Sequence, residues 1–137
     1  MQKNYQVSLL FAAVFFAALS TATYNGKTLA DDIQFIPDNM NYSFSHVDKC
    51  VPKKICAINN SNQEITDPGF SISKSKHFHI QEKFQDCPNP LPPGGTCVVY
   101  VNFCPEFVTY YQDVLTFSGS GSEIQIVLEG EGTSNPP

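Results

Sequence analysis

His77 and His79 flank Phe78 and are spaced for metal chemistry. Residues i and i+2 of a β-strand point to the same side, so both imidazoles could reach one ion. Imidazole nitrogens suit copper and zinc, and His46 or Asp86 would be the further ligand. The alternative is an exposed strand face with Phe78 in the core, and we expect no resident metal or cofactor.

The second chemically active set is the five cysteines. They are Cys50, Cys56, Cys87, Cys97 and Cys104. Their spacing contains no C-x2-C pair, which disfavours a structural zinc site. Disulfides persist in oxidising compartments, so the cysteines favour an exported protein. Because five is odd, one thiol is left over or pairs between chains.

Catalytic patterns are missing from the sequence. Nucleophilic catalysis needs a nucleophile, a base and an orienting group that converge in space. No G-x-S-x-G motif occurs, and the Pro93-Gly94-Gly95 stretch lacks the lysine and the following helix of a phosphate-binding loop. We therefore expect a protein that is not an enzyme.

The loop from Pro88 to Gly95 is rich in proline and glycine. A rigid loop loses little entropy on binding, which is how an inhibitor presents a preorganised surface. On that hypothesis Leu91 and the prolines of the Pro88–Gly95 loop would contact the target.

The composition of the chain limits the function classes. The chain has 137 residues, of which 42% are apolar and 15% charged, enough for the core of one domain and too short for a two-domain enzyme. Its 8 basic residues are all lysines, and 13 acids give a net charge of −5. An acidic chain without arginine is a poor nucleic-acid binder, because binding depends on neutralising phosphates.

The amino-terminal segment has the layout of a secretory signal peptide. Lys3 precedes an apolar run over residues 7–19, followed by small residues. A spanning helix needs about 20 apolar residues, so we expect no transmembrane anchor after cleavage. Cleavage is predicted after Ala22 or Ala30. Residues 1–30 are therefore expected to be a signal peptide with a short lead, and residues 31–137 the folded domain.

The rest of the chain predicts short strands. Apolar and polar residues alternate with a period of two, and turn residues separate the runs. The predicted strands are 42–47, 54–59, 77–80, 97–103, 111–117 and 123–129, with an added edge strand at 33–36. About seven short strands in about 100 residues predict an all-β fold, a single β-sandwich.

Several motifs resemble one known group of domains. Residues 91–105 read LPPGGTCVVYVNFCP and residues 126–132 read IVLEGEG. Together with residues 44–47, 55–61 and 111–117, they resemble the abnormal-spindle/Hydin-type immunoglobulin-like domains, including the choice-of-anchor D domains of bacterial exported proteins. Ser61 replaces the usual turn glycine, and three of the cysteines are foreign to the pattern.

This resemblance implies a seven-strand immunoglobulin-like sandwich with a disulfide between Cys87 and Cys97. The segment between these two cysteines contains prolines and glycines, which let the chain fold back and bring the two sulfurs together. In the implied register Cys56 and Cys104 lie on the outer face of neighbouring antiparallel strands, so a Cys56–Cys104 bridge is an open alternative. Cys50–Cys104 and Cys50–Cys56 are its rivals.

These features predict a non-enzymatic, exported interaction or structural module. It would be periplasmic, secreted or at the cell surface, and it would bind one or more protein partners but no nucleic acid. It would act through loops or through an edge strand, as a small subunit of an envelope or surface assembly. The alternatives are a periplasmic metal binder using His77 and His79, and a secreted inhibitor using the Pro88–Gly95 loop.

Overall fold

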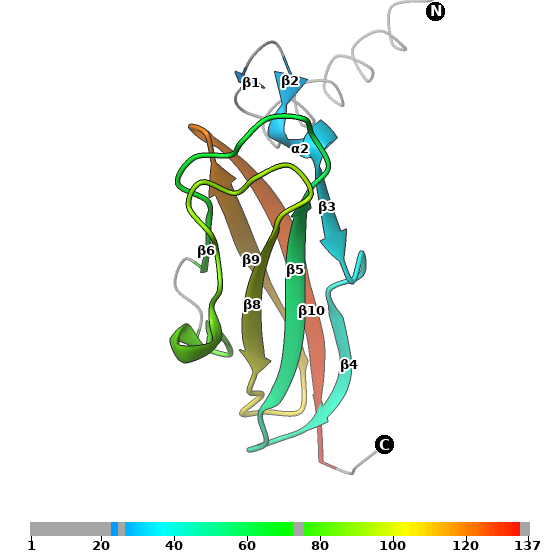
Figure 1. Cartoon of the computed structure of the whole chain (residues 1–137). Coiled ribbons are helices and arrows are strands. Elements are labelled where there is room, and N and C mark those ends of the chain that lie inside the picture. Colours follow the sequence, from blue (N-terminus) through cyan, green and yellow to red (C-terminus); the bar gives the residue numbers. More distant parts are fainter. Residues whose placement is uncertain (1–22, 25–26, 73–75, 135–137) are drawn as a thin grey trace, which may run out of the picture.

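The computed structural model describes residues 23–24, 27–72 and 76–134, and the predicted signal peptide up to Ala22 lies outside these residues. The described chain forms a β-sandwich of two four-stranded sheets (Figure 1). The elements are, in order, β1 (Thr23–Tyr24), β2 (Lys27–Thr28), α2 (Leu29–Asp32), β3 (Ile33–Ile36), β4 (Asn41–His46), β5 (Val51–Asn59), β6 (Gly69–Ile72), β7 (Phe78–Ile80), the 3-10 turn η1 (Glu82–Phe84), β8 (Thr96–Phe103), β9 (Tyr110–Gly119) and β10 (Ser122–Thr133).

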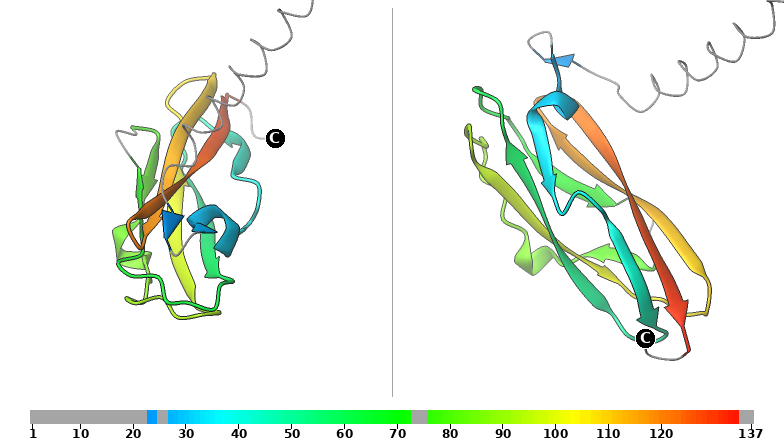
Figure 2. Two further views of the ribbon diagram at one scale, coloured as in Figure 1. Left: turned by 90° about the horizontal axis from the view of Figure 1, so that it is seen from above. Right: turned by 90° about the vertical axis from the view of Figure 1, so that its right-hand side faces the viewer.

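The topology is immunoglobulin-like. One sheet has the order β3-β5-β8-β7 and is antiparallel throughout, and the other has the order β4-β10-β9-β6. The chain changes sheets between β3 and β4, and β4 then pairs with β10 in parallel (Figure 2). Sequential strands divide between the two sheets as in immunoglobulin constant domains. The predicted all-β, immunoglobulin-like sandwich is therefore confirmed, while its strand count is corrected below.

The core lies between the inner faces of the sheets. In β8 every second side chain is buried: Cys97, Val99, Val101 and Phe103 are fully enclosed. Leu115 and Phe117 of β9 and Leu128 of β10 face them from the other sheet. This inward set has the alternation expected of a half-buried strand, which is why the sequence predicted these strands.

Two strand predictions need correction. β6 (Gly69–Ile72) was not predicted, because its first residue belongs to the turn-forming sequence Asp67-Pro68-Gly69. The two main sheets therefore hold eight strands among the described residues, whereas about seven were expected. β7 begins at Phe78, so His77 lies just outside it. The edge strand expected at 33–36 is present as β3.

No helix among the described residues has both the length and the apolar character needed to cross a membrane.

Candidate functional site

The structure joins Cys50 to Cys104 and leaves Cys56 as a free thiol. The antiparallel register of β5 and β8 explains this choice, because Val51 pairs with Phe103 and the positions just beyond them are Cys50 and Cys104. The same register places Cys56 opposite Val98. The Cys56–Cys104 alternative was therefore wrong in register, although the two strands are neighbours as expected.

Cys87 and Cys97 form the second disulfide, the pairing that the family resemblance implied. Cys97 is fully buried in β8, and Cys87 lies on the segment that approaches β8 from η1. Backbone hydrogen bonds between Asp86 and Val98 hold this segment beside the strand. The bridge thus closes the loop that contains Pro88–Gly95.

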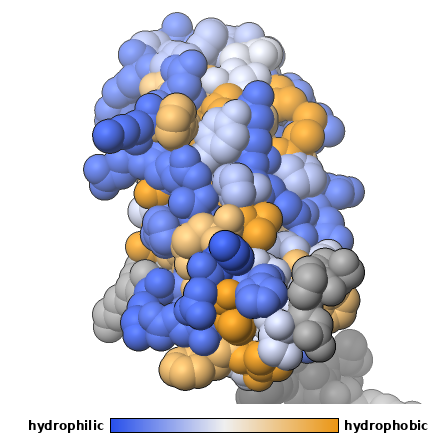
Figure 3. Space-filling model, turned by 90° about the horizontal axis from the view of Figure 1, so that it is seen from below, coloured by the Kyte–Doolittle hydropathy of each residue, from blue (hydrophilic) through white to orange (hydrophobic). Residues whose placement is uncertain are grey.

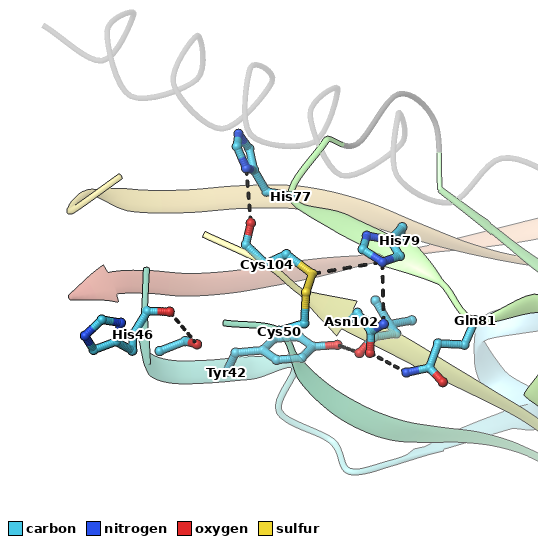
Figure 4. Close-up of a disulfide and its surroundings, with 10 residues drawn as sticks. Tyr42, His46, Cys50, His77, His79, Gln81, Asn102 and Cys104 are labelled. Atoms are coloured by element: carbon cyan, nitrogen blue, oxygen red, sulfur yellow. Dashed lines mark hydrogen bonds between the residues drawn. A yellow bond between two sulfur atoms is a disulfide. The ribbon is translucent and has the colours of Figure 1, made fainter. Parts of the chain in front are cut away.

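His77 and His79 do not converge on one point, and their imidazoles point in different directions (Figure 4). The His77 ring packs on Tyr111, with centroids 4.4 Å apart, and its Nδ1 lies 3.3 Å from the carbonyl oxygen of Cys104. His79 is exposed on the outer face of its sheet, where its Nε2 is 3.5 Å from Asn102 Nδ2. The predicted common side required a regular strand through both residues, and β7 begins only at Phe78.

The other two candidate ligands do not complete such a site. His46 lies on β4 and its Nδ1 is 2.7 Å from the carbonyl oxygen of Val47, while Asp86 is bound through its backbone to Val98. Among residues 23–24, 27–72 and 76–134, no group of three or more His, Cys, Asp or Glu side chains is placed to hold a metal ion.

The Pro88–Gly95 loop is held firmly, but Leu91 does not face solvent. Leu91 is fully buried and its backbone exchanges two hydrogen bonds with Ile65. The buried side chain of Asn59 donates to the carbonyl oxygens of Leu91 and Gln63, at 3.1 and 2.7 Å. Leu91 is therefore a core residue, and the expectation that it contacts a target is wrong.

Exposed apolar side chains gather at the opposite end of the sandwich, where β8 turns into β9. We call Phe44, Phe107, Val108 and Tyr110 the apolar end. Phe107 is 67% exposed and Val108 61%, and Phe44 and Tyr110 are each 55% exposed. Phe44 and Tyr110 both lie next to Glu131 of β10 and line one shallow depression. Figure 3 views the molecule from this end and shows apolar side chains at the surface among polar ones.

The backbone that carries Phe107 and Val108 is fixed on several sides. The Cys50–Cys104 disulfide anchors its start, and the Asp48 N–H donates to the Pro105 carbonyl at 2.9 Å. The Phe107 N–H donates to the hydroxyl of Tyr111 at 2.8 Å. These contacts present Phe107 and Val108 on a braced loop.

Gly132 allows the same loop to approach β10 closely. A Cβ at this position would overlap the carbonyl oxygen of Phe107 and the ring of Pro105. The Gly132 N–H also donates to the Thr109 carbonyl at 2.9 Å. Only glycine leaves room for this packing, so the backbone of the loop closes this end of the sandwich.

An ion pair and a tyrosine with a shifted pKa lie near the apolar end. Lys76 Nζ and Glu106 Oε2 are 2.8 Å apart on the surface, and the hydrogen bond from Lys76 lowers the pKa of Glu106. Desolvation, followed by a hydrogen bond to Glu129, raises the pKa of Tyr110. An exposed ion pair of this kind contributes little stability.

Tyr42 is a structural residue that the sequence did not single out. Its ring packs between Phe78 and Phe103, with centroids 5.6 Å from each, and its hydroxyl donates to the carbonyl oxygen of Val101 at 2.7 Å. Burial raises the pKa of Tyr42. Nothing in the local sequence marks it, because the alternation of β4 is interrupted by the positive φ of Ser43.

Sequence comparisons identify no relative, since no family model and no curated protein sequence matches the chain. Solved structures do match it. The VesB protease of Vibrio cholerae is 16% identical with a TM-score of 0.57, and the match covers 83% of this chain and 41% of that one. The ASH/PapD-like domain 7 of human CEP192 is 10% identical with a TM-score of 0.54, over 85% of this chain and 96% of that one. The secreted serine protease VesC from Vibrio cholerae is 14% identical with a TM-score of 0.53, over 71% of this chain and 22% of that one.

These likenesses establish an immunoglobulin-like fold and nothing about activity, because one fold hosts many functions. The chain spans less than half of either protease. Among the described residues, His46 contacts the carbonyl oxygen of Val47, His77 contacts that of Cys104, and His79 contacts the side chains of Asn102 and Cys104.

Proposed function

We propose that the chain is an exported, non-enzymatic interaction module that binds a protein partner through the apolar end. The observation that carries this proposal is the exposure of Phe107 and Val108 on a loop fixed by a disulfide and by backbone hydrogen bonds. Large apolar side chains held rigidly in water are typical of protein-binding surfaces. A rigid loop also loses little conformational entropy on binding.

Export is supported by the disulfides. Two bridges in a domain of this size indicate folding in an oxidising compartment. Leu29, in the short helix α2, is 1% exposed, so cleavage after Ala30 would delete a core side chain. We therefore favour cleavage after Ala22, and the amino-terminal residue of the exported protein, read by intact mass, tests this choice.

The proposal includes a role as a small subunit of an envelope or surface assembly. It also includes membership of the abnormal-spindle/Hydin group, which is supported by the family-like motifs of β8 and β10 in an immunoglobulin-like sandwich. Attachment to a larger partner would cover the exposed side chains of the apolar end.

Native size in a gently solubilised extract of the source cells tests the proposal. The wild-type protein is expected to migrate with a complex much larger than the monomer. The double variant Phe107→Ser/Val108→Ser should migrate as a monomer with an unchanged urea midpoint, because both side chains are mostly exposed. Phe84→Ser is the matched control, since Phe84 is 60% exposed on η1, away from the apolar end. Monomeric migration of the wild type, or equal loss with Phe84→Ser, contradicts the proposal.

A further inference from the structure

A second surface lies where the chain changes sheets between β3 and β4. β10 is 12 residues long, but β4 pairs only with its final part, from Glu129 to Thr133. Over the first half of β10, no other described strand pairs on the side opposite β9. This half of β10 is a strand edge inside the body of the domain (Figure 2).

The register shows which backbone groups are free at this edge. In an antiparallel pair, alternate residues bond to the partner strand and the others point away from it. Glu129 donates its N–H to the Met40 carbonyl, on the side away from β9, and Gly132 donates to Thr109 on the β9 side. The backbone N–H and C=O groups of the odd-numbered residues of β10 therefore point away from β9. The N–H and C=O groups of Gln125 and Val127 share this direction, and β4 does not reach them.

The space beside this edge is a groove of about 480 Å³, lined by both apolar and polar residues. We call it the edge groove. Its floor includes Phe35, Ile124 and Ile126, which are partly buried and pack against the core. The Phe35 ring meets the core ring of Phe117 edge-on, with centroids 6.0 Å apart. A side chain that enters the groove would therefore contact the core of the sandwich.

The rim of the edge groove is acidic. Among the described residues that line it, the charged ones are Asp38 and Glu129. Asp38 is exposed on the crossover between β3 and β4, and Glu129 is half-buried on the outer face of β10. A ligand that carries lysine or arginine on the solvent side would complement both carboxylates.

We propose that the edge groove accepts an extended segment of a protein partner, which adds to β10 as a strand. Its backbone would bond to Gln125 and Val127. Its alternate apolar side chains would cover Phe35, Ile124 and Ile126, and its intervening basic side chains would face Asp38 and Glu129. Main-chain bonds supply affinity and the apolar pockets supply specificity in this mode of recognition.

Amide hydrogen exchange on the free, disulfide-bonded protein tests whether the N–H groups of Gln125 and Val127 are unbonded. The amides of Gln125 and Val127 are expected to exchange faster than those of Ile124 and Ile126, which bond to β9. Slow exchange at Gln125 and Val127 would mean that these amides are already bonded within the protein, and the proposal would fail.

Binding is tested with the synthetic peptide KVKIKVK, followed by amide chemical shifts. Shifts are expected at Gln125, Val127 and Phe35. Two N-methylated forms of the peptide, methylated at alternate sets of amides, act as controls because only one set can face β10. The form methylated at the amides that face β10 should bind at least about tenfold more weakly, because it cannot donate to the strand. The other form should bind as the unmodified peptide does.

Charge is tested separately from shape. Asp38→Lys should weaken KVKIKVK binding by about threefold at low salt, and the exposed Glu64, far from the groove lining, provides the control Glu64→Lys. Unchanged affinity with both N-methylated peptides, shifts centred on the apolar end, or no binding at millimolar peptide each overturns the proposal.

Discussion

Removing the Cys50–Cys104 bridge should restore more entropy to the unfolded chain than removing the Cys87–Cys97 bridge. The bridge closes a sequence separation of 54 residues, for which the chain-entropy relation gives about 4 kcal/mol. The Cys87–Cys97 bridge closes a separation of 10, which gives about 3 kcal/mol. We therefore expect Cys50→Ser/Cys104→Ser to lose about 4 kcal/mol of unfolding free energy. Cys87→Ser/Cys97→Ser is not a matched comparison, because it also places a hydroxyl in the core at Cys97.

Urea unfolding without reductant measures this loss. With a slope of about 1–1.5 kcal/mol per molar urea, a loss of 4 kcal/mol lowers the midpoint by about 3 M. Cys56→Ser is the matched control: Cys56 is half-buried and free, so its free energy of unfolding should change by less than about 0.5 kcal/mol. Thiol titration of the unfolded wild type should find one free thiol, and a non-reduced digest should place it at Cys56.

The opposite pattern would refute the register argument. If Cys56→Ser lowered the free energy of unfolding as much as Cys104→Ser, and the digest joined Cys56 to Cys104, then β5 and β8 would not pair as described. If the Cys50→Ser/Cys104→Ser variant lost less than about 1 kcal/mol, the bridge would not restrain the unfolded chain as the entropy relation requires.

Three further predictions concern the buried residues. Asn59→Ala should lower the free energy of unfolding in urea by about 3 kcal/mol, because four side-chain hydrogen bonds are lost. Asn60→Ala, which loses one exposed hydrogen bond, should lower it by under about 0.5 kcal/mol, and equal losses would contradict the structural role of Asn59. Leu91→Ala should cost about 2–5 kcal/mol and the exposed Pro92→Ala about 1 kcal/mol or less, and the reverse order would mean that Leu91 is not a core residue. Burial raises the pKa of Tyr42 above its ordinary 10.0, so the contribution of Tyr42 to stability is complete below pH 10.0 and is lost as the pH rises toward the raised value. Tyr42→Phe should therefore reduce the loss of unfolding free energy at alkaline pH. If stability falls with pH as steeply in the variant as in the wild type, Tyr42 is not the source of the loss.

The strands that alternate strictly were predictable from the sequence. In β8 the pattern of Val99, Val101 and Phe103 can be buried only if the chain is extended, and β10 shows the same alternation. β6 escaped prediction because its first residue, Gly69, completes the turn-forming sequence Asp67-Pro68-Gly69. The parallel pairing of β4 with β10 also escaped, because pairing depends on where the chain crosses between sheets, which local alternation does not encode.

The candidate site was less predictable than the fold. Leu91 stands among prolines and glycines, and such a loop suggests exposure, but its backbone pairing with Ile65 turns the side chain inward. Phe107 and Val108 have the apolar character of a strand, and only the bend after Cys104 leaves them in water. Exposure at a loop depends on tertiary contacts, which the spacing of residues does not specify.

The claim that the apolar end contacts a partner is tested most directly by site-specific photo-crosslinking in the source cells. A photoreactive phenylalanine analogue is placed at Val108 and, in a separate chain, at Phe84, which is similarly exposed. The account predicts a discrete cross-linked product from position 108 and none from position 84. Cross-linking from position 84 alone, or from neither position in cells where the wild type migrates in a complex, would contradict it.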